Sequence, residues 1–234
     1  MVAAQSLFPI EPAAEEQRLV LSGVPWSTYV TLREALDHTN LRMTYLEGTL
    51  EILSPSRRHE VEKKQFARFL ELFCLERDIP LFAYGSTTWR SEAKARGLEA
   101  DECYSRGERE LPEIAIEVIV SHGSVDKLEV YRGLGIREVW LFSLCQSPPA
   151  TPSASRPDPV SLGGTRDPFG DLPEGFEAGA CTVLSLREAG YMKIPSSEVI
   201  PEVDLVRIVQ YAMRPDQHAA LRAYRDELRG SRRA

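Results

Sequence analysis

One carboxylate interrupts a strongly apolar stretch of the chain. Glu117 lies within residues 114–120, and the other six residues of that stretch are alanine, isoleucine or valine. An isolated ionised group costs several kcal/mol to bury unless it is paired or binds a metal. Asp101 precedes Glu117 by sixteen positions, and Lys127 follows it by ten. Two carboxylates and a lysine are groups that metal-assisted phosphodiester hydrolysis uses, so we expect these three residues to form a site.

The expected chemistry assigns a role to each of these residues. Hydrolysis needs an activated water and stabilisation of a highly charged transition state, and a divalent cation supplies both. Mg²⁺ prefers oxygen ligands and keeps several waters, so two carboxylates and a backbone carbonyl suffice, with Mn²⁺ as a substitute. We therefore expect Asp101, Glu117 and the carbonyl of Val118 to bind the metal. Lys127 would orient or polarise the attacking water and offset charge on the phosphate.

The elements that would position these residues can be predicted from local pattern. Residues 114–120 are apolar on both faces, which is typical of a central strand. Residues 100–104 predict a neighbouring strand that carries Asp101. Ser124 is a candidate cap for a helix over residues 124–134, which places Lys127 in its first turn. A second buried strand, residues 138–142, completes a strand–helix–strand unit.

The remaining elements follow from spacing and turn residues. Glu47-Gly48 predicts a tight hairpin turn between short strands at residues 44–46 and 49–53. Residues 57–77 carry aromatic and aliphatic side chains at helical spacing, and the first helix is expected after Trp26, with Ser27 or Thr28 as its cap. Further strands are expected at 81–84, 88–90, 181–185 and 191–194, and a terminal helix up to about residue 229. The predicted fold class is α/β, with a mixed sheet flanked by helices.

Composition limits the class of protein. Hydrophobic residues make up 43% and charged residues 27% of the 234 residues, as in ordinary globular proteins. The formal net charge of -7 opposes avid binding to a polyanion, although a local basic strip can oppose the average. The four cysteines are scattered, and no segment approaches the roughly 20 apolar residues of a spanning helix. We therefore expect a cytoplasmic protein with reduced thiols and no membrane partner.

Proline and glycine usage suggests a division into four parts. Residues 1–24 contain little periodicity and are expected to form a loose N-terminal arm. Residues 25–145 would form the core. Residues 146–179 contain seven prolines, which predicts a flexible insertion. Residues 180–234 would add a hairpin and a helix that pack on the core.

Several motifs together resemble a known family. They are residues 97–104 (GLEADECY), 111–118 (LPEIAIEV), 126–131 (DKLEVY) and 135–141 (GIREVWL), with looser similarity at Glu47-Gly48, Ser54-Pro55 and His59. This combination resembles the PD-(D/E)XK nuclease superfamily and, within it, the bacterial restriction-endonuclease-like proteins of the Uma family. The resemblance implies a restriction-endonuclease-like core, Asp101 and Glu117 as Mg²⁺ ligands, and Lys127 as the lysine of the site. It also implies a homodimer, by analogy with related nucleases.

The sequence departs from the superfamily pattern at two positions. Ala100 stands where a proline usually precedes the metal-binding aspartate, and Ile119 stands where the pattern places lysine. A lysine moved to the following helix is a recurring variant in this family, so Lys127 can take that role. The resemblance also makes Glu47 a candidate outer acid and His59 a candidate contact to the phosphate or the water. Otherwise Glu47 would be an exposed turn residue and His59 a surface or capping residue.

Three functions fit these observations. The first is a Mg²⁺-dependent endonuclease that hydrolyses phosphodiester bonds in DNA or another nucleic acid. The second is a non-catalytic binding or regulatory protein on a nuclease fold, in which Glu117 forms a structural ion pair. The third is a hydrolase of a small phosphorylated substrate, which the acidic net charge would suit. The charged face of residues 57–77, with Lys64 and Arg68, is either a solvated surface or a strip that contacts phosphate.

Overall fold

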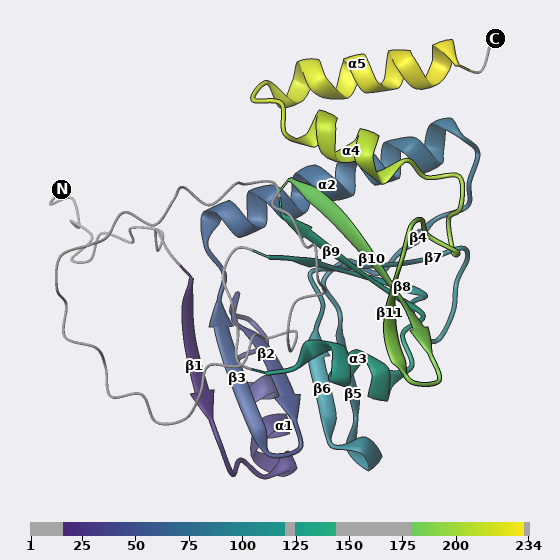
Figure 1. Cartoon of the computed structure of the whole chain (residues 1–234). Coiled ribbons are helices and arrows are strands. Elements are labelled where there is room, and N and C mark those ends of the chain that lie inside the picture. Colours follow the sequence, from purple (N-terminus) through teal and green to yellow (C-terminus); the bar gives the residue numbers. More distant parts are fainter. Residues whose placement is uncertain (1–15, 120–124, 144–178, 232–234) are drawn as a thin grey trace, which may run out of the picture.

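Two β-sheets meet near the centre of the molecule, and helices cover them (Figure 1). The computed structural model describes residues 16–119, 125–143 and 179–231. The predicted α/β class is confirmed, but the strands form two sheets where one was expected. No helix in these described ranges is long and apolar enough to cross a membrane.

The first sheet is antiparallel, with strand order β1-β3-β2-β6-β5. Its members are β1 (Gln17–Leu21), β2 (Arg42–Leu46), β3 (Thr49–Ser54), β5 (Thr88–Ser91) and β6 (Arg96–Glu99). The β2–β3 turn is the predicted hairpin, since Glu47 and Gly48 both have positive φ, at 46° and 94°. Helix α1 (Trp26–Ala35) packs Tyr29 against Tyr45 of this sheet, with ring centroids 4.9 Å apart.

The second sheet is mixed, with strand order β11-β10-β9-β8-β7-β4. Its members are β4 (Phe82–Ala83), β7 (Glu102–Ser105), β8 (Ile114–Val118), β9 (Glu138–Ser143), β10 (Ala180–Arg187) and β11 (Gly190–Ile194). Every residue of β8 is buried, as its apolar sequence predicts. Among the described strands, β8 and β9 are the one parallel pair, and α3 (Lys127–Leu134) connects them. A single 3-10 turn (Glu92–Lys94) joins β5 to β6.

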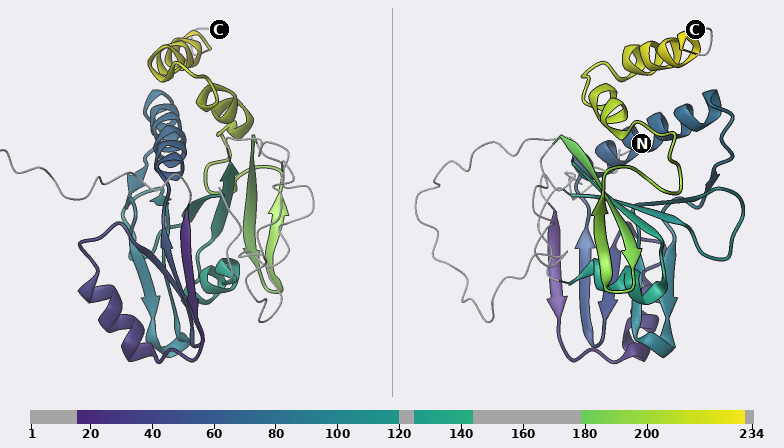
Figure 2. Two further views of the ribbon diagram at one scale, coloured as in Figure 1. Left: turned by 90° about the vertical axis from the view of Figure 1, so that its left-hand side faces the viewer. Right: turned by 45° about the vertical axis from the view of Figure 1, so that its right-hand side comes forward.

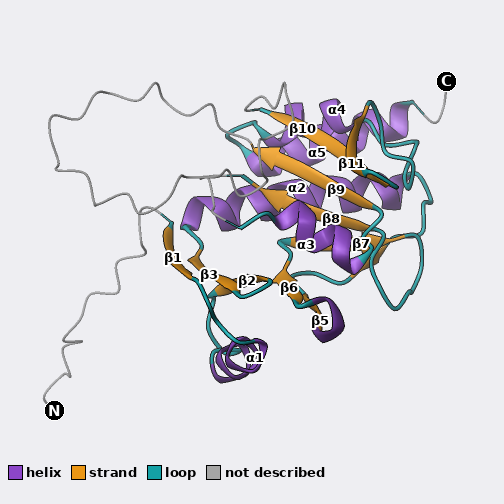
Figure 3. Ribbon diagram, turned by 60° about the horizontal axis from the view of Figure 1, so that its bottom comes forward, coloured by secondary structure: helices purple, strands orange, loops and turns teal. Residues whose placement is uncertain are grey.

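Helices cover both faces of the second sheet (Figure 3). On one face α2 (Arg57–Glu76), α4 (Leu205–Ala212) and α5 (Gln217–Gly230) share a core with Ile116 of β8 and Phe142 of β9. On the other face α3 packs Val130 and Tyr131 against β8, β9 and β6 of the first sheet. Side chains alternate along a strand, so Glu117 lies on the α3 side of β8. Figure 2 shows α1 (purple) and α5 (yellow) at opposite ends of the molecule.

Three of the predicted boundaries are wrong. The expected strand over 100–104 is interrupted, because β6 pairs in the first sheet and β7 in the second, and Asp101 lies at the crossing between them. Part of the predicted loose arm is the edge strand β1, whose mostly exposed side chains leave no apolar periodicity. Helix α1 begins at Trp26 with Pro25 at the cap position, so neither Ser27 nor Thr28 caps it.

The structure adds one helix and one helix cap to the predicted elements, and two predictions fall outside the described residues. Helix α4 was not predicted, although Leu205, Ile208, Val209 and Ala212 have helical spacing. Asp126 caps α3 through the Glu129 backbone N–H, at 2.9 Å, while the expected cap Ser124 lies outside the described residues. The predicted proline-rich insertion also lies outside them, apart from Gly179.

Candidate active site

The structure brings Asp101 and Glu117 to facing positions on neighbouring chain segments. Strands β7 and β8 pair with Glu102 opposite Ile116, and this antiparallel register continued by one residue sets Asp101 opposite Glu117. The backbone N–H of Val118 donates to Asp101 Oδ2 at 2.8 Å. Both carboxylates are almost fully buried, at 1% exposure each. The cost of burying two acids side by side has to be offset by donors around them.

Helix α3 supplies both donors to Glu117. Lys127 Nζ donates to Glu117 Oε2 at 2.6 Å, and the Tyr131 hydroxyl donates a short hydrogen bond to Oε1. Residues four apart lie on the same face of a helix, so one turn of α3 presents both groups to the carboxylate. The predicted helix therefore places Lys127 where the sequence analysis expected it, in contact with Glu117.

Asp101 is held by basic side chains from two other elements. His59 of α2 lies with Nε2 at 2.9 Å from Asp101 Oδ1, and Arg42 of β2 places Nε at 3.4 Å from the same oxygen. The other ring nitrogen of His59, Nδ1, lies 2.7 Å from Glu16 Oε1. His59 is therefore a buried partner of Asp101 and not a surface residue.

These contacts shift the pKa values of the four central groups. Burial alone would lower the pKa of His59, but Asp101 and Glu16 raise it to about 9, so His59 is protonated and donates to both carboxylates. Burial opposes ionisation of Asp101, but His59 and Arg42 lower its pKa well below the usual range. Burial and the neighbouring Asp101 raise the pKa of Glu117. Burial disfavours the Lys127 ammonium, yet Glu117, Asp101 and Glu51 raise its pKa overall.

Arg42 connects this cluster to the first sheet. Its guanidinium contacts Glu99 Oε1 at 3.2 Å, Glu60 Oε1 at 3.1 Å and the carbonyl of Ala100 at 3.3 Å. Arg42 was not predicted, because nothing local marks it and its contact with Asp101 joins residues 59 positions apart. Tyr131 was also missed, although its position four residues after Lys127 on one helix face was a usable signal.

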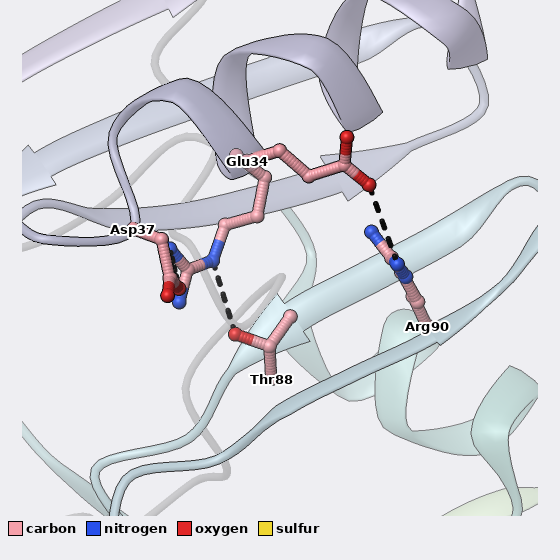
Figure 4. Close-up of a pocket in the computed structure, with 5 residues that line it drawn as sticks. Glu34, Asp37, Thr88 and Arg90 are labelled. Carbon is pink, nitrogen blue, oxygen red and sulfur yellow. Dashed lines mark hydrogen bonds and ion pairs between the residues drawn. The ribbon is translucent and has the colours of Figure 1, made fainter.

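A surface cavity of about 350 Å³ is connected to Arg42 through Glu99 (Figure 4). Arg33 lines this cavity and donates to Glu99 Oε2 at 3.1 Å, and Glu99 in turn binds Arg42. The carboxylates of Glu34 and Asp37 also line the cavity and pair with Arg90 and Arg33. The two arginines of this cavity are thus balanced by two carboxylates, and the cavity lies outside the Asp101–Glu117 cluster.

Glu47 takes no part in the contacts that join Asp101 and Glu117. It lies at the β2–β3 turn, at the other end of β2 from Arg42, with its side chain 65% exposed and paired with Arg96 at 3.1 Å. The buried acid of this hairpin is instead Glu51 of β3, at 1% exposure, which pairs with Arg18 at 2.5 Å. Glu51 was not predicted as a buried acid. A polar residue in a short hairpin strand is expected to face solvent, and nothing in the sequence marks Glu51 as an exception.

The carboxylate chemistry of the cluster fits a hard divalent cation. The described residues contain no group of three or more histidine, cysteine, aspartate or glutamate side chains arranged for a metal. The ligands predicted from the sequence are the two buried carboxylates Asp101 and Glu117. Each carboxylate has about four lone-pair positions, and the protein donors described above leave some of them open. Mg²⁺ keeps several waters, so two carboxylates meet its need for protein ligands. The carbonyl of Val118 as a third ligand stays a prediction.

Comparison with known proteins supports the resemblance drawn from the motifs. No curated protein sequence matches the chain. Residues 26–162 match the Uma2 family, described as putative restriction endonucleases, and the mixed α/β architecture agrees with the restriction-endonuclease-like fold predicted for it. The match includes Asp101, Glu117 and Lys127 and covers more than half of the chain. The protein therefore belongs to the Uma2 family.

Proposed function

We propose that this protein is a Mg²⁺-dependent endonuclease that hydrolyses phosphodiester bonds in DNA. The observation that carries the proposal is that Asp101 accepts a hydrogen bond from the backbone N–H of Val118, next to Glu117, while the Lys127 ammonium lies 2.6 Å from Glu117. Two carboxylates and a lysine at one strand end are the groups that metal-assisted phosphodiester hydrolysis requires. Membership of a family of restriction-endonuclease type supports the same substrate class.

Each residue of the cluster has a distinct task in this proposal. Asp101 and Glu117 would hold the cation, which when bound supplies an activated water and neutralises charge on the phosphate. His59 and Arg42 keep Asp101 ionised and fix its orientation. Lys127 keeps its positive charge at neutral pH and lies where it can hold a water and offset the negative charge that builds on phosphate oxygens. Tyr131 fixes the second oxygen of Glu117.

One observation favours a second candidate, a non-catalytic binding protein on the nuclease fold. Every carboxylate oxygen of Asp101 and Glu117 already accepts a hydrogen bond from a protein donor, and both residues are 1% exposed. Such a network resembles a structural ion-pair cluster. In that case neither Mg²⁺ nor Mn²⁺ would change the behaviour of the protein toward DNA.

Cleavage of supercoiled plasmid and of single-stranded DNA tests the proposal. The wild type is compared with Glu117→Gln in Mg²⁺, in Mn²⁺ and in EDTA. The matched control is Glu113→Gln, which removes a carboxylate next to the other end of β8. We expect metal-dependent nicking or linearisation by the wild type and by Glu113→Gln, and a loss of at least 100-fold in Glu117→Gln. Equal inactivity of all three proteins on every substrate would favour the binding protein.

A further inference from the structure

Three of the exposed basic side chains of helix α2 lie on one face of the helix. Arg57, Lys64 and Arg68 are exposed, and Lys64 is 70% exposed with a distant pairing to Glu102 at 3.8 Å. Separations of seven and four residues set them on one face of the helix, about 10 Å and about 6 Å apart along its axis. Their spacing forms a line of positive charge on a protein whose formal net charge is -7.

The carboxylates of α2 nearest to this line are engaged by other partners. Glu60 pairs with Arg42 at 3.1 Å and with Lys63 at 2.5 Å, which lowers the pKa of the Glu60 carboxyl despite its partial burial. Glu71 accepts a hydrogen bond from the buried Tyr104 hydroxyl at 3.0 Å. Because Glu60 is paired elsewhere, the three charges of Arg57, Lys64 and Arg68 outnumber the two carboxylates near them, Glu71 and Glu102.

Helix α5 continues the line of positive charge. Arg68 Nη1 donates to Gln217 Oε1 at 3.3 Å, and α2 and α5 lie side by side (Figures 1 and 2). Between them lies a cavity of about 460 Å³ whose lining includes Arg68, Arg222 and Arg225, together with Glu71 and several leucines. Asp226 pairs with Arg225 at 3.3 Å. The basic side chains of the two helices form a surface that we call the basic track: Arg57, Lys64, Arg68, Arg222 and Arg225.

The helix that carries the basic track also contributes to the candidate active site. Lys64 of the basic track lies 3.8 Å from Glu102, the residue after Asp101, and His59 on the buried side of the same helix contacts Asp101. One turn later, Lys63 Nζ lies 3.5 Å from Ser86 Oγ, which donates to the carbonyl of Asp101 at 2.9 Å. The α2 part of the basic track therefore spans about 16 Å, from Arg57 to Arg68, on the same helix as His59, and Arg222 and Arg225 of α5 follow it.

We propose that the basic track binds the phosphate backbone of double-stranded DNA and aligns the duplex with the Asp101–Glu117 site. This inference rests on the proposed function for its substrate and adds the surface that would hold it. Lysine and arginine contacts to phosphate give affinity and orientation without reading base sequence. Each such contact releases condensed counterions, so binding through the basic track depends strongly on salt concentration.

Fluorescence anisotropy with a labelled DNA duplex in EDTA tests the proposal, because EDTA separates binding from cleavage. The test variant is Lys64→Ala/Arg68→Ala. The control is Arg109→Ala/Arg137→Ala, which removes the same charge from two arginines that are 54% and 52% exposed near the opposite end of β8. We expect the test variant to bind at least tenfold more weakly, with a salt-dependence slope smaller by roughly 2, and the control to bind like the wild type.

The other outcomes overturn the proposal. Unchanged binding by the test variant, or equal weakening in both variants, would show that the basic track does not hold the duplex. If the wild type bound no duplex at low salt, the proposed role of the basic track would also be wrong. Plasmid cleavage in Mg²⁺ is measured separately, so a wild type that cleaves DNA while the test variant binds normally would refute the basic track and leave the proposed function standing.

Discussion

Two neighbouring carboxylates have opposite environments at the candidate site. Asp101 faces His59 and Arg42, and its pKa is lowered, so it is ionised throughout the physiological range. Glu117 faces one ammonium and one hydroxyl, and burial together with Asp101 raises its pKa. Pairs of titratable groups whose pKa values are driven apart are typical of sites that handle protons. The protein thereby keeps one permanent anion and one more readily protonated acid at facing positions.

The Tyr131 hydroxyl is expected to fix Glu117 for metal binding. Tyr131→Phe removes its hydrogen bond to Oε1 and leaves the ring in place, so we expect the Mg²⁺ concentration for half-maximal plasmid cleavage to rise by about tenfold or more. The matched control is Tyr104→Phe, because Tyr104 is equally buried and donates to Glu71, away from the site. Equal Mg²⁺ requirements for the two variants would argue against this role.

The pKa of His59 predicts how stability depends on pH. A histidine with a folded pKa of about 9 stabilises the fold fully below its unfolded value of about 6.5, and this contribution is lost as pH rises through 9. The free energy of unfolding of the wild type should therefore exceed that of His59→Gln most at pH 6. We expect the difference to shrink by roughly 3 kcal/mol between pH 6 and pH 10.

Urea denaturation in EDTA at each pH measures this difference without any contribution from bound metal. A wild type that gains stability relative to His59→Gln as pH rises would contradict a protonated His59 between Asp101 and Glu16. Lys127 cannot be tested in the same way, because its pKa is raised from an already high value and the protein would have to be studied at a strongly alkaline pH.

At the scale of elements, helix α3 explains why Ile119 stands where the superfamily pattern has lysine. Residues 117 and 119 would share one side of an extended strand, but β8 ends at Val118, and Ile119 packs with Val125 and Val130 in the core beside α3. A lysine at position 119 would bury its ammonium in that cluster. Lys127, in the first turn of α3, contacts Glu117 instead, at 2.6 Å.

Close packing of α1 on the first sheet depends on Gly97 of β6. A Cβ at this position would lie 2.9 Å from Tyr29 Cε1 and closer still to the hydroxyl. Tyr29 is fully buried and stacks on Tyr45, so it has no room to move. Gly97→Ala should therefore lower the free energy of unfolding by about 1–3 kcal/mol.

Gly230→Ala is the control for this effect. A Cβ at Gly230 meets no described atom within 4 Å, and alanine favours helix over glycine, so this variant should match the wild type or exceed it slightly. Thermal denaturation of both variants compares them. If Gly97→Ala were as stable as Gly230→Ala, the described contact between α1 and β6 would be wrong.

At the scale of the whole molecule, local pattern predicted the parts of the fold that carry local signals. The central strand β8, the hairpin at Glu47-Gly48 and the amphipathic helix α2 were found because apolar spacing and turn residues mark them. The edge strand β1 and the division into two sheets were missed, because an exposed edge strand has no apolar period and strand pairing between distant segments leaves no local trace.

The candidate site shows the same limit. Lys127 and Glu117 are ten residues apart, and the helix that joins them could be predicted together with the motif. Arg42 and His59 reach Asp101 from 59 and 42 positions away, and only the folded chain brings them there. The motifs therefore identified the residues proposed to do the chemistry, while the residues that set their charge and orientation required the structure.

Binding of Mn²⁺ by isothermal titration calorimetry tests the central claim most directly, because it requires no knowledge of the DNA sequence that the protein cleaves. We expect saturable Mn²⁺ binding by the wild type and by Glu113→Gln, with at least about 100-fold weaker binding by Asp101→Asn and by Glu117→Gln. Circular dichroism confirms that each variant is folded. A folded wild type that binds no Mn²⁺, or variants that bind it as tightly as the wild type, would contradict a metal site at Asp101 and Glu117.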